Sequence, residues 1–379
     1  MEHPAALKAA NGHYPWHAGA PDDISFKAAY DELITRTNSL LSELNLDQLK
    51  LEDYPVHVQI PSGVSAEYVV DAYGEALADV AEKRKDLVAL SADLTADCRL
   101  CSFERRHPDR LIENGIAEQD MVSMAGGLAL AGLLPVVNTF ASFLSARANE
   151  QIYNNACERT RIIYANHYAG LIPAGPGQSH QSIRDISLFG ALPNFEILQP
   201  CNAAETQMAV EYVVNESAEN CVLRLNIGPS PRLIELPAQY RLKKGCGVTL
   251  TDGKDAILFS YGPVMLNEAL LAADLLRAED FQLKVVNMPW LNRADVTWLV
   301  DVIGECPAIY VLEDHAKIGG LAETLLNTIK QKRVFEAEPF QVFGIEGYPA
   351  CGTPAEALTF HSLDGASLAS RISQNRNHG

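Results

Sequence analysis

Short apolar runs alternate with longer segments of helical periodicity along most of this 379-residue chain, and this alternation constrains the fold more than any other feature. Apolar strands that alternate with amphipathic helices are typical of a parallel sheet covered by helices on both faces. The chain is also too long for one ordinary hydrophobic core. The sequence therefore predicts an α/β fold with two consecutive parallel-sheet domains.

The first predicted sheet domain spans residues 64–240, and the second spans residues 248–379. Prolines close the first domain, and residues 242–247 read as a linker. In the first domain we expect strands at 87–91, 134–137, 161–165, 195–198 and 221–225, and helices at 66–82, from 118, at 146–156 and at 203–214. In the second we expect strands at 256–260, 283–286, 308–312 and 340–343, and helices at 266–276, 296–303, 321–329 and 363–372.

Residues 1–63 are predicted to form a separate amino-terminal extension. Within it, segment 26–46 carries apolar residues on one side and polar residues on the other, which predicts an amphipathic helix; the apolar residues are Leu33, Leu40, Leu41 and Leu44. Pro55 and the Pro61-Ser-Gly63 turn separate this helix from the first sheet domain. The helix is either a docking arm for a partner or a brace on its own chain.

Composition excludes several classes of partner. The chain has 30 Lys and Arg against 48 Asp and Glu, a net charge of -18, and no basic cluster that could follow a nucleic-acid backbone. No apolar run approaches the ~20 residues of a membrane span, and the amino terminus lacks the order of a signal peptide, so we expect a cytoplasmic protein. The 8 cysteines are scattered, and Cys98 and Cys101 have no further ligands nearby, so no metal site is expected on this chain.

Glu118 lies where a strand ends and a helix of small and apolar residues begins. The helix that it begins carries Met121, Met124, Ala125 and Leu128 at three- and four-residue steps, so its body should be buried while its first turn opens on a cleft. A carboxylate in that place can hydrogen-bond a ring nitrogen of a neutral heterocycle. The alternative is an ordinary glutamate that stabilises the first turn of a helix.

The run Gly115-Ile-Ala-Glu-Gln119 resembles the pyrimidine-binding domain of the thiamine-diphosphate-dependent transketolase family, and the resemblance covers roughly residues 64–375. It implies that Glu118 hydrogen-bonds N1′ of the aminopyrimidine of the coenzyme. The carboxylate would then favour the imino tautomer and help the 4′-nitrogen to remove the thiazolium C2 proton. Thiamine diphosphate is therefore the expected coenzyme.

Further motifs carry the same resemblance. In Asn138-Thr-Phe-Ala-Ser-Phe143, Phe143 is the expected stacking partner of the aminopyrimidine and Phe140 lies behind it, although both rings can also be read as core. In Gly175-Pro-Gly-Gln-Ser-His-Gln181, His180 is implied as the acid/base group that faces the substrate. His167, at the end of a strand, resembles a histidine at the rim of the substrate channel. The alternative for His167 is a polar residue with a structural role.

The chain departs from the family pattern at three substrate contacts. Pro176 replaces an aspartate, Ile227 replaces an arginine that grips the substrate phosphate, and Val70 replaces a second arginine. An aliphatic side chain cannot reproduce the bidentate grip of arginine on phosphate, so a standard phosphorylated ketose is doubtful as substrate. Arg184 is a candidate for binding another anion, such as a carboxylate. Asp314 and His315 read as structural residues rather than a catalytic pair.

No Gly-Asp-Gly occurs in the sequence, although the family holds the diphosphate and its metal with that loop. The resemblance therefore implies a split enzyme, in which a separate diphosphate-binding subunit carries Mg²⁺ or Ca²⁺ and the assembly is α2β2. The expected activity is transfer of a two-carbon ketol unit, or a related acyl unit, from a small ketose to an aldehyde. The alternatives are a β subunit of a 2-oxo acid dehydrogenase and a non-catalytic regulatory homologue.

Overall fold

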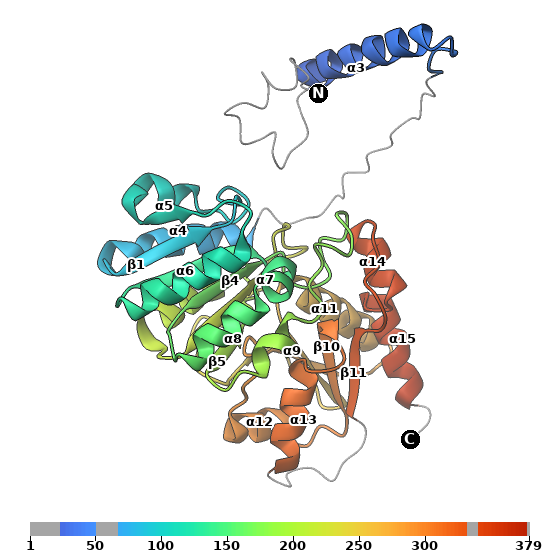
Figure 1. Cartoon of the computed structure of the whole chain (residues 1–379). Coiled ribbons are helices and arrows are strands. Elements are labelled where there is room, and N and C mark those ends of the chain that lie inside the picture. Colours follow the sequence, from blue (N-terminus) through green and yellow to red (C-terminus); the bar gives the residue numbers. More distant parts are fainter. Residues whose placement is uncertain (1–22, 51–66, 332–339, 377–379) are drawn as a thin grey trace. The chain divides into compact units, whose positions relative to one another are not determined.

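The computed structural model describes residues 23–50, 67–331 and 340–376 (Figure 1). By its internal contacts the chain divides into two units, Met1–Ser62 and Gly63–Gly379. In the first unit the predicted amphipathic helix is present as α3 (Asp23–Glu43). Leu33 and Leu40 are exposed on it, and Leu44, the residue after its end, is exposed as well. Pro55 and residues 61–63 lie outside the described residues.

The second unit begins with a six-stranded parallel sheet in the order β2-β1-β3-β4-β6-β5. Every residue of β1, β3, β4, β5 and β6 is buried, which explains why these strands read as continuous apolar runs. The strands are β1 (Leu87–Ser91), β2 (Leu111–Glu113), β3 (Leu134–Phe140), β4 (Ile163–His167), β5 (Phe195–Leu198) and β6 (Asn220–Leu225). The helices are α4 (Val69–Lys83), α5 (Cys101–Arg106), α6 (Glu118–Leu130), α7 (Ala141–Arg147), α8 (Asn149–Cys157), α9 (Asp185–Gly190) and α10 (Ala203–Glu211).

A five-stranded sheet follows in the order β11-β10-β8-β9-β7, in which β7 alone runs antiparallel to its neighbour. Alternate residues of its strands face two different helix layers: Ile257 and Phe259 share a core with α12 and α13, whereas Leu258 packs with α11 and α15 (Figure 1). The strands are β7 (Val248–Thr251), β8 (Ala256–Ser260), β9 (Leu283–Asn287), β10 (Ile309–Ala316) and β11 (Phe340–Ile345). The helices are α11 (Pro263–Arg277), α12 (Val296–Ile303), α13 (Leu321–Gln331), α14 (Pro354–Phe360) and α15 (Gly365–Arg376).

The predicted fold class, with two consecutive sheets, is confirmed. The sequence indicates a strand before Glu118, which is β2, without its bounds, and it does not predict β7, none of whose residues is fully buried. The single helix expected at 146–156 is two helices, α7 and α8, which meet at Ala148. In the part of the chain that the structure describes, no helix is both long enough and apolar enough to cross a membrane.

The two sheets of the second unit are joined by a buried polar cluster around Arg224 of β6. Its guanidinium donates Nε to Asp185 Oδ2 at 2.8 Å and Nη1 to Asp314 Oδ1 at 3.1 Å, and it also donates to Gln199. Arg224 and Asp185 are fully buried and Asp314 nearly so. Since Asp314 belongs to β10 and is held in this ion pair, its structural role, preferred from sequence, fits its contacts. His315 is likewise buried, and burial lowers its pKa.

Candidate active site

Glu118 is the first residue of α6 and its side chain is buried, with 4% exposed. The turn before it depends on Gly115, which has φ +66 and donates its backbone N–H to Glu113 Oε1 at 2.9 Å. A carboxylate at a helix amino terminus is stabilised by the helix dipole. Oε1 of Glu118 accepts a hydrogen bond from Arg147 Nη1 at 2.6 Å, and Oε2 accepts none from the described residues.

A cluster of rings lies beside this carboxylate, from the end of β3, from α7 and from the loops after β4. The centroids of Phe140 and Phe143 are 5.3 Å apart, and the ring of His180 is 5.7 Å from Phe140 and 5.1 Å from Phe143. Tyr168 contacts both Phe140 and His180, at 5.4 and 5.8 Å. Phe140 is buried and Phe143 is half-buried, so Phe143 is the ring more open to a ligand.

Arg147 connects the carboxylate to this cluster, because its guanidinium carbon lies 3.9 Å from the centroid of the Phe143 ring. Glu118, Phe143 and His180, three of the residues expected at the site, are therefore joined by direct contacts through Arg147. Burial and the nearby charge of Arg147 lower the pKa of His180 below its usual value. His180 Nδ1 lies 2.9 Å from Ser179 Oγ.

The structure places His167 in the interior, which corrects the expected position at the rim of a channel. As the last residue of β4, it is fully buried, and burial lowers its pKa to about 3. Its ring contacts the edge of Tyr73 at 5.2 Å, and Nε2 lies 3.4 Å from Asn138 Oδ1. Nδ1 has no hydrogen-bond partner among the described residues. The side chain is buried at a face of the sheet, where Tyr73 of α4 packs against it.

Tyr168 is a site residue that sequence reasoning missed. It follows the last residue of β4 and has φ +59, a left-handed conformation that is rare for a bulky residue and is often found at functional sites. Its Oη is buried without a partner among the described residues, and burial, with Cys351 nearby, raises its pKa. An aromatic residue directly after a strand-end histidine was the only available signal in the sequence.

The loop that carries His180 is held by contacts with β10 and with the segment between β11 and α14. The side-chain amide of Gln181 donates to Leu171 O and to Ala350 O, each at 2.9 Å. Gly170, at the start of this loop, has φ +84 and packs so closely against Asp314 that a Cβ would meet the carboxylate oxygen at 1.7 Å. Residues of the second sheet therefore help to fix the position of His180.

Comparison with known proteins identifies the family. Residues 68–228 match the transketolase pyrimidine-binding domain, and residues 245–368 match the transketolase C-terminal domain. A transketolase family protein of Sinorhizobium fredii is 34% identical over 304 residues, which cover 80% of this chain and 86% of that protein. The chain belongs to the transketolase family. The residues around Glu118 therefore lie in the pyrimidine-binding domain of a transketolase family member.

Other relatives differ in how much of their length this chain spans. A transketolase C-terminal section of Methanocaldococcus jannaschii is 29% identical, with 79% of this chain and 93% of that protein covered. A split gene transketolase solved as an inactive β4 tetramer has a TM-score of 0.72 and 28% identity, with 82% and 98% covered. By contrast, the chain spans 40% of the 1-deoxy-D-xylulose-5-phosphate synthase of Halothermothrix orenii, at 30% identity over 68% of this chain.

Three residues of this transketolase family member depart from the family's sequence pattern, and the structure shows how exposed each of them is. Pro176 is exposed in the loop before His180, Ile227 is half-buried, and Val70 is fully buried in α4. Arg184 is exposed, and its guanidinium makes no hydrogen bond or ion pair with the described residues. Among residues 23–50, 67–331 and 340–376, no group of three or more His, Cys, Asp or Glu could hold a metal ion.

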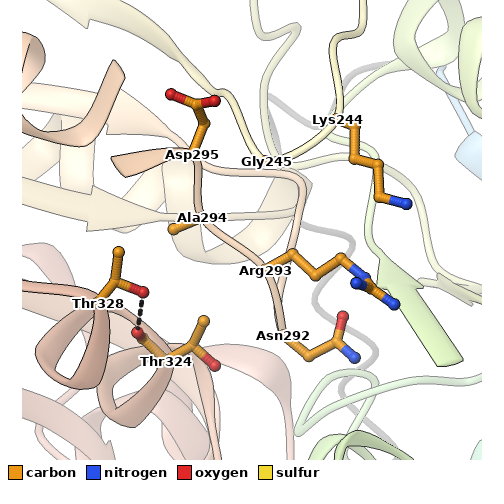
Figure 2. Close-up of a pocket in the computed structure, with 8 residues that line it drawn as sticks. All are labelled: Lys244, Gly245, Asn292, Arg293, Ala294, Asp295, Thr324 and Thr328. Atoms are coloured by element: carbon orange, nitrogen blue, oxygen red, sulfur yellow. Dashed lines mark hydrogen bonds between the residues drawn. The ribbon is translucent and has the colours of Figure 1, made fainter. Parts of the chain in front are cut away.

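A hollow of about 350 Å³ lies apart from the residues around Glu118 and is shown in Figure 2. Lys244, Arg293 and Asp295 line it together with Thr324 and Thr328 of α13. Its two cationic side chains are already paired with carboxylates: Lys244 contacts Glu196, and Arg293 contacts Glu219. Because these charges offset one another, the hollow offers no unpaired charge to an anion, and we do not assign it a ligand.

Proposed function

We propose that this chain is the C-terminal, pyrimidine-side subunit of a two-component transketolase-like enzyme that depends on thiamine diphosphate. The observation that carries the proposal is the buried carboxylate of Glu118 at the start of α6, beside the ring of Phe143 and the imidazole of His180. The reaction proposed is transfer of a two-carbon ketol unit, or a related acyl unit, to an aldehyde acceptor. The domain boundaries at 64–240 and 248–379 and the cytoplasmic location are part of this proposal.

The residues around Glu118 fit the aminopyrimidine of the coenzyme. A flat heterocycle needs a hydrogen-bonding group at a ring nitrogen and an apolar face, and Glu118 Oε2 and Phe143 offer both from neighbouring helices. When bound, thiamine diphosphate supplies the carbanion chemistry that cleaves and forms bonds next to a carbonyl. Glu118 would hold the ring nitrogen, Phe143 would orient the ring, and Phe140 would support Phe143.

His180 is proposed to move protons on the hydroxyl groups of the substrate. Its lowered pKa leaves the imidazole neutral at physiological pH, which suits a group that first accepts a proton. His167 is proposed only as a residue that supports the site from within, since its ring is buried. Tyr168, packed on His180, extends the same wall.

The diphosphate half of the pocket is assigned to a partner subunit. The described residues hold no group of carboxylates suited to Mg²⁺ or Ca²⁺, and a diphosphate needs such a cation to offset its charge. The relatives whose full length this chain approaches are named a C-terminal section and a split gene transketolase. These findings support a diphosphate-binding, N-terminal subunit as partner, with an α2β2 assembly as the proposed arrangement.

The proposed substrate is a ketose or related donor without a phosphate group. Ile227 and Val70 offer no charge to a phosphate, and Pro176 cannot donate or accept with its side chain. Arg184 has an unpaired guanidinium within the described structure and is proposed to bind a carboxylate. The proposed substrate class is argued from these four residues, Pro176, Ile227, Val70 and Arg184.

The test is an assay of this chain co-purified with the diphosphate-binding subunit, supplied with thiamine diphosphate, Mg²⁺ and an aldehyde acceptor. We expect turnover with unphosphorylated ketoses or 2-oxo acids, and a loss of about 10²–10⁴-fold in the Glu118→Ala variant. Glu104→Ala, which removes an exposed glutamate of α5, is the matched control and should not change the rate.

Each possible failure of that assay points to a different account. Efficient use of pentose phosphates would overturn the substrate proposal. Acyl transfer to a lipoyl group would favour the β subunit of a 2-oxo acid dehydrogenase. If the pair showed no coenzyme-dependent turnover with any donor, the chain would be a non-catalytic, regulatory homologue.

A further inference from the structure

Arg147 makes two contacts that no sequence motif predicts. It is the last residue of α7, four positions after Phe143, so the two side chains lie on one face of that helix. Its guanidinium carbon is 3.9 Å from the Phe143 ring centroid, and its Nη1 donates to Glu118 Oε1 at 2.6 Å. One side chain therefore links the two groups that are proposed to hold the aminopyrimidine, although they come from different helices.

The hydrogen bond from Arg147 makes the two carboxylate oxygens of Glu118 different from each other. Oε1 is taken by the guanidinium, while Oε2 has no hydrogen-bond partner among the described residues. A charge-assisted hydrogen bond of this length strongly favours one orientation of a carboxylate. The arrangement therefore fixes the carboxylate through one oxygen and leaves the other available to a ligand.

The stacking contact fixes the ring in the same way. A guanidinium over an aromatic face is attracted by the electrons of the ring, and the preceding residue, Ala146, is too small to support Phe143. Phe140 and His180 pack against the Phe143 ring, and Arg147 adds a contact on one face of that half-buried ring. Arg147 thus holds the Phe143 ring and the Glu118 carboxylate in place relative to each other.

We infer that Arg147 is a positioning residue for the coenzyme: through Oε1 it sets the Glu118 carboxylate so that Oε2 meets the pyrimidine ring nitrogen, and it holds Phe143 for stacking. The inference rests on the proposed function. It differs from an ordinary surface ion pair, which contributes little and would not affect a ligand. The Arg147 side chain is 45% exposed, so it is not part of the hydrophobic core, whereas its partner Glu118 is buried.

The test compares Arg147→Met and Arg147→Lys in the co-purified complex, with Arg105→Met, an exposed arginine of α5, as matched control. Calorimetry measures the affinity for thiamine diphosphate with Mg²⁺, and quenched-flow NMR measures the exchange of the C2 proton of the coenzyme. We expect Arg147→Met to weaken affinity and slow exchange, each about 10-fold, which corresponds to about 1.4 kcal/mol. Arg147→Lys should recover part of the exchange rate, because it keeps the charge but loses the planar fork.

A double mutant shows whether Arg147 acts through Glu118. In a Glu118→Gln background, the further change Arg147→Met should slow C2 exchange less than 2-fold, because the group that it positions is already lost. Wild-type exchange in Arg147→Met, in a complex that binds the coenzyme, would overturn the positioning role and leave the proposed function standing. A wild-type complex that does not bind thiamine diphosphate would overturn both.

Discussion

His167, at the end of β4, and His180, in the loop that follows β4, differ in burial, and their burial limits the chemistry open to each. His180 is half-buried in a wall of rings, where it can still meet a substrate, and its pKa is lowered by burial and by Arg147. His167 is fully buried beside Tyr73 and Asn138, and its pKa falls to about 3. His180 is therefore the better placed of the two for proton transfer to a substrate, and we expect His167 to act through stability.

The buried His167 makes a testable contribution to acid sensitivity. The unfolded chain binds a proton at this histidine below its ordinary pKa of ~6.5, whereas the folded chain stays neutral down to about 3. Stability from this residue is therefore complete above pH ~6.5 and falls as the pH drops toward 3. Between pH 7 and pH 5, wild type should lose about 2 kcal/mol more than His167→Gln, measured by urea denaturation at each pH.

A second histidine provides the comparison for that measurement. His361, at the end of α14, is only partly buried, and burial lowers its pKa as well. His361→Gln should therefore change the pH dependence less than His167→Gln does. If wild type and His167→Gln lost the same free energy of unfolding between the two pH values, His167 would not be held neutral in the folded state.

Motifs that resemble those of the transketolase family predicted Glu118, Phe140, Phe143 and His180 as residues of one site. They could not predict the side-chain contacts of Arg147, since a helix spacing shows which residues share a face but not what lies opposite. His167 was assigned to the rim of a channel by its resemblance to a family histidine; in the structure it is the last residue of β4 (Ile163–His167) and is buried.

Among the elements, the loop from Gly170 to Ser182 depends most on the rest of the fold. Backbone hydrogen bonds close its ends, from Gly170 N to Ser182 O and from Ser182 N to Gly170 O. Gln181 then ties it to Ala350, which is 169 positions away in the sequence. A contact of that range has no local signature, so the sequence could predict the loop but not what holds it in place.

Replacing Gln181 tests this account of the loop. Gln181→Leu keeps the approximate volume but removes both N–H donors, leaving the carbonyls of Leu171 and Ala350 without their partner. We expect amide hydrogen exchange across residues 174–182 to rise about 10-fold, and kcat/KM to fall by a similar factor because His180 is less well placed. The exposed Gln207→Leu on α10 is the control. Unchanged exchange in the loop of Gln181→Leu would show that the segment between β11 and α14 does not hold it.

The proposed function gives the chain as a whole one half of a coenzyme pocket. Glu118, Phe143 and His180 are joined through side-chain contacts, yet the described residues offer no metal site for a diphosphate. The sequence predicted the two sheets because their central strands are almost entirely buried, and it missed the edge strand β7, whose residues are partly exposed. The absent Gly-Asp-Gly is the sequence observation that led us to propose a partner for the diphosphate.

Calorimetric titration of thiamine diphosphate with Mg²⁺ tests the half-pocket most directly. Three samples are compared: this chain alone, the diphosphate-binding subunit alone, and the two combined. We predict tight binding only to the combined sample, because neither half can both hold the pyrimidine and offset the charge of the diphosphate. Tight binding to this chain alone, or no binding to the combined subunits, would contradict the account.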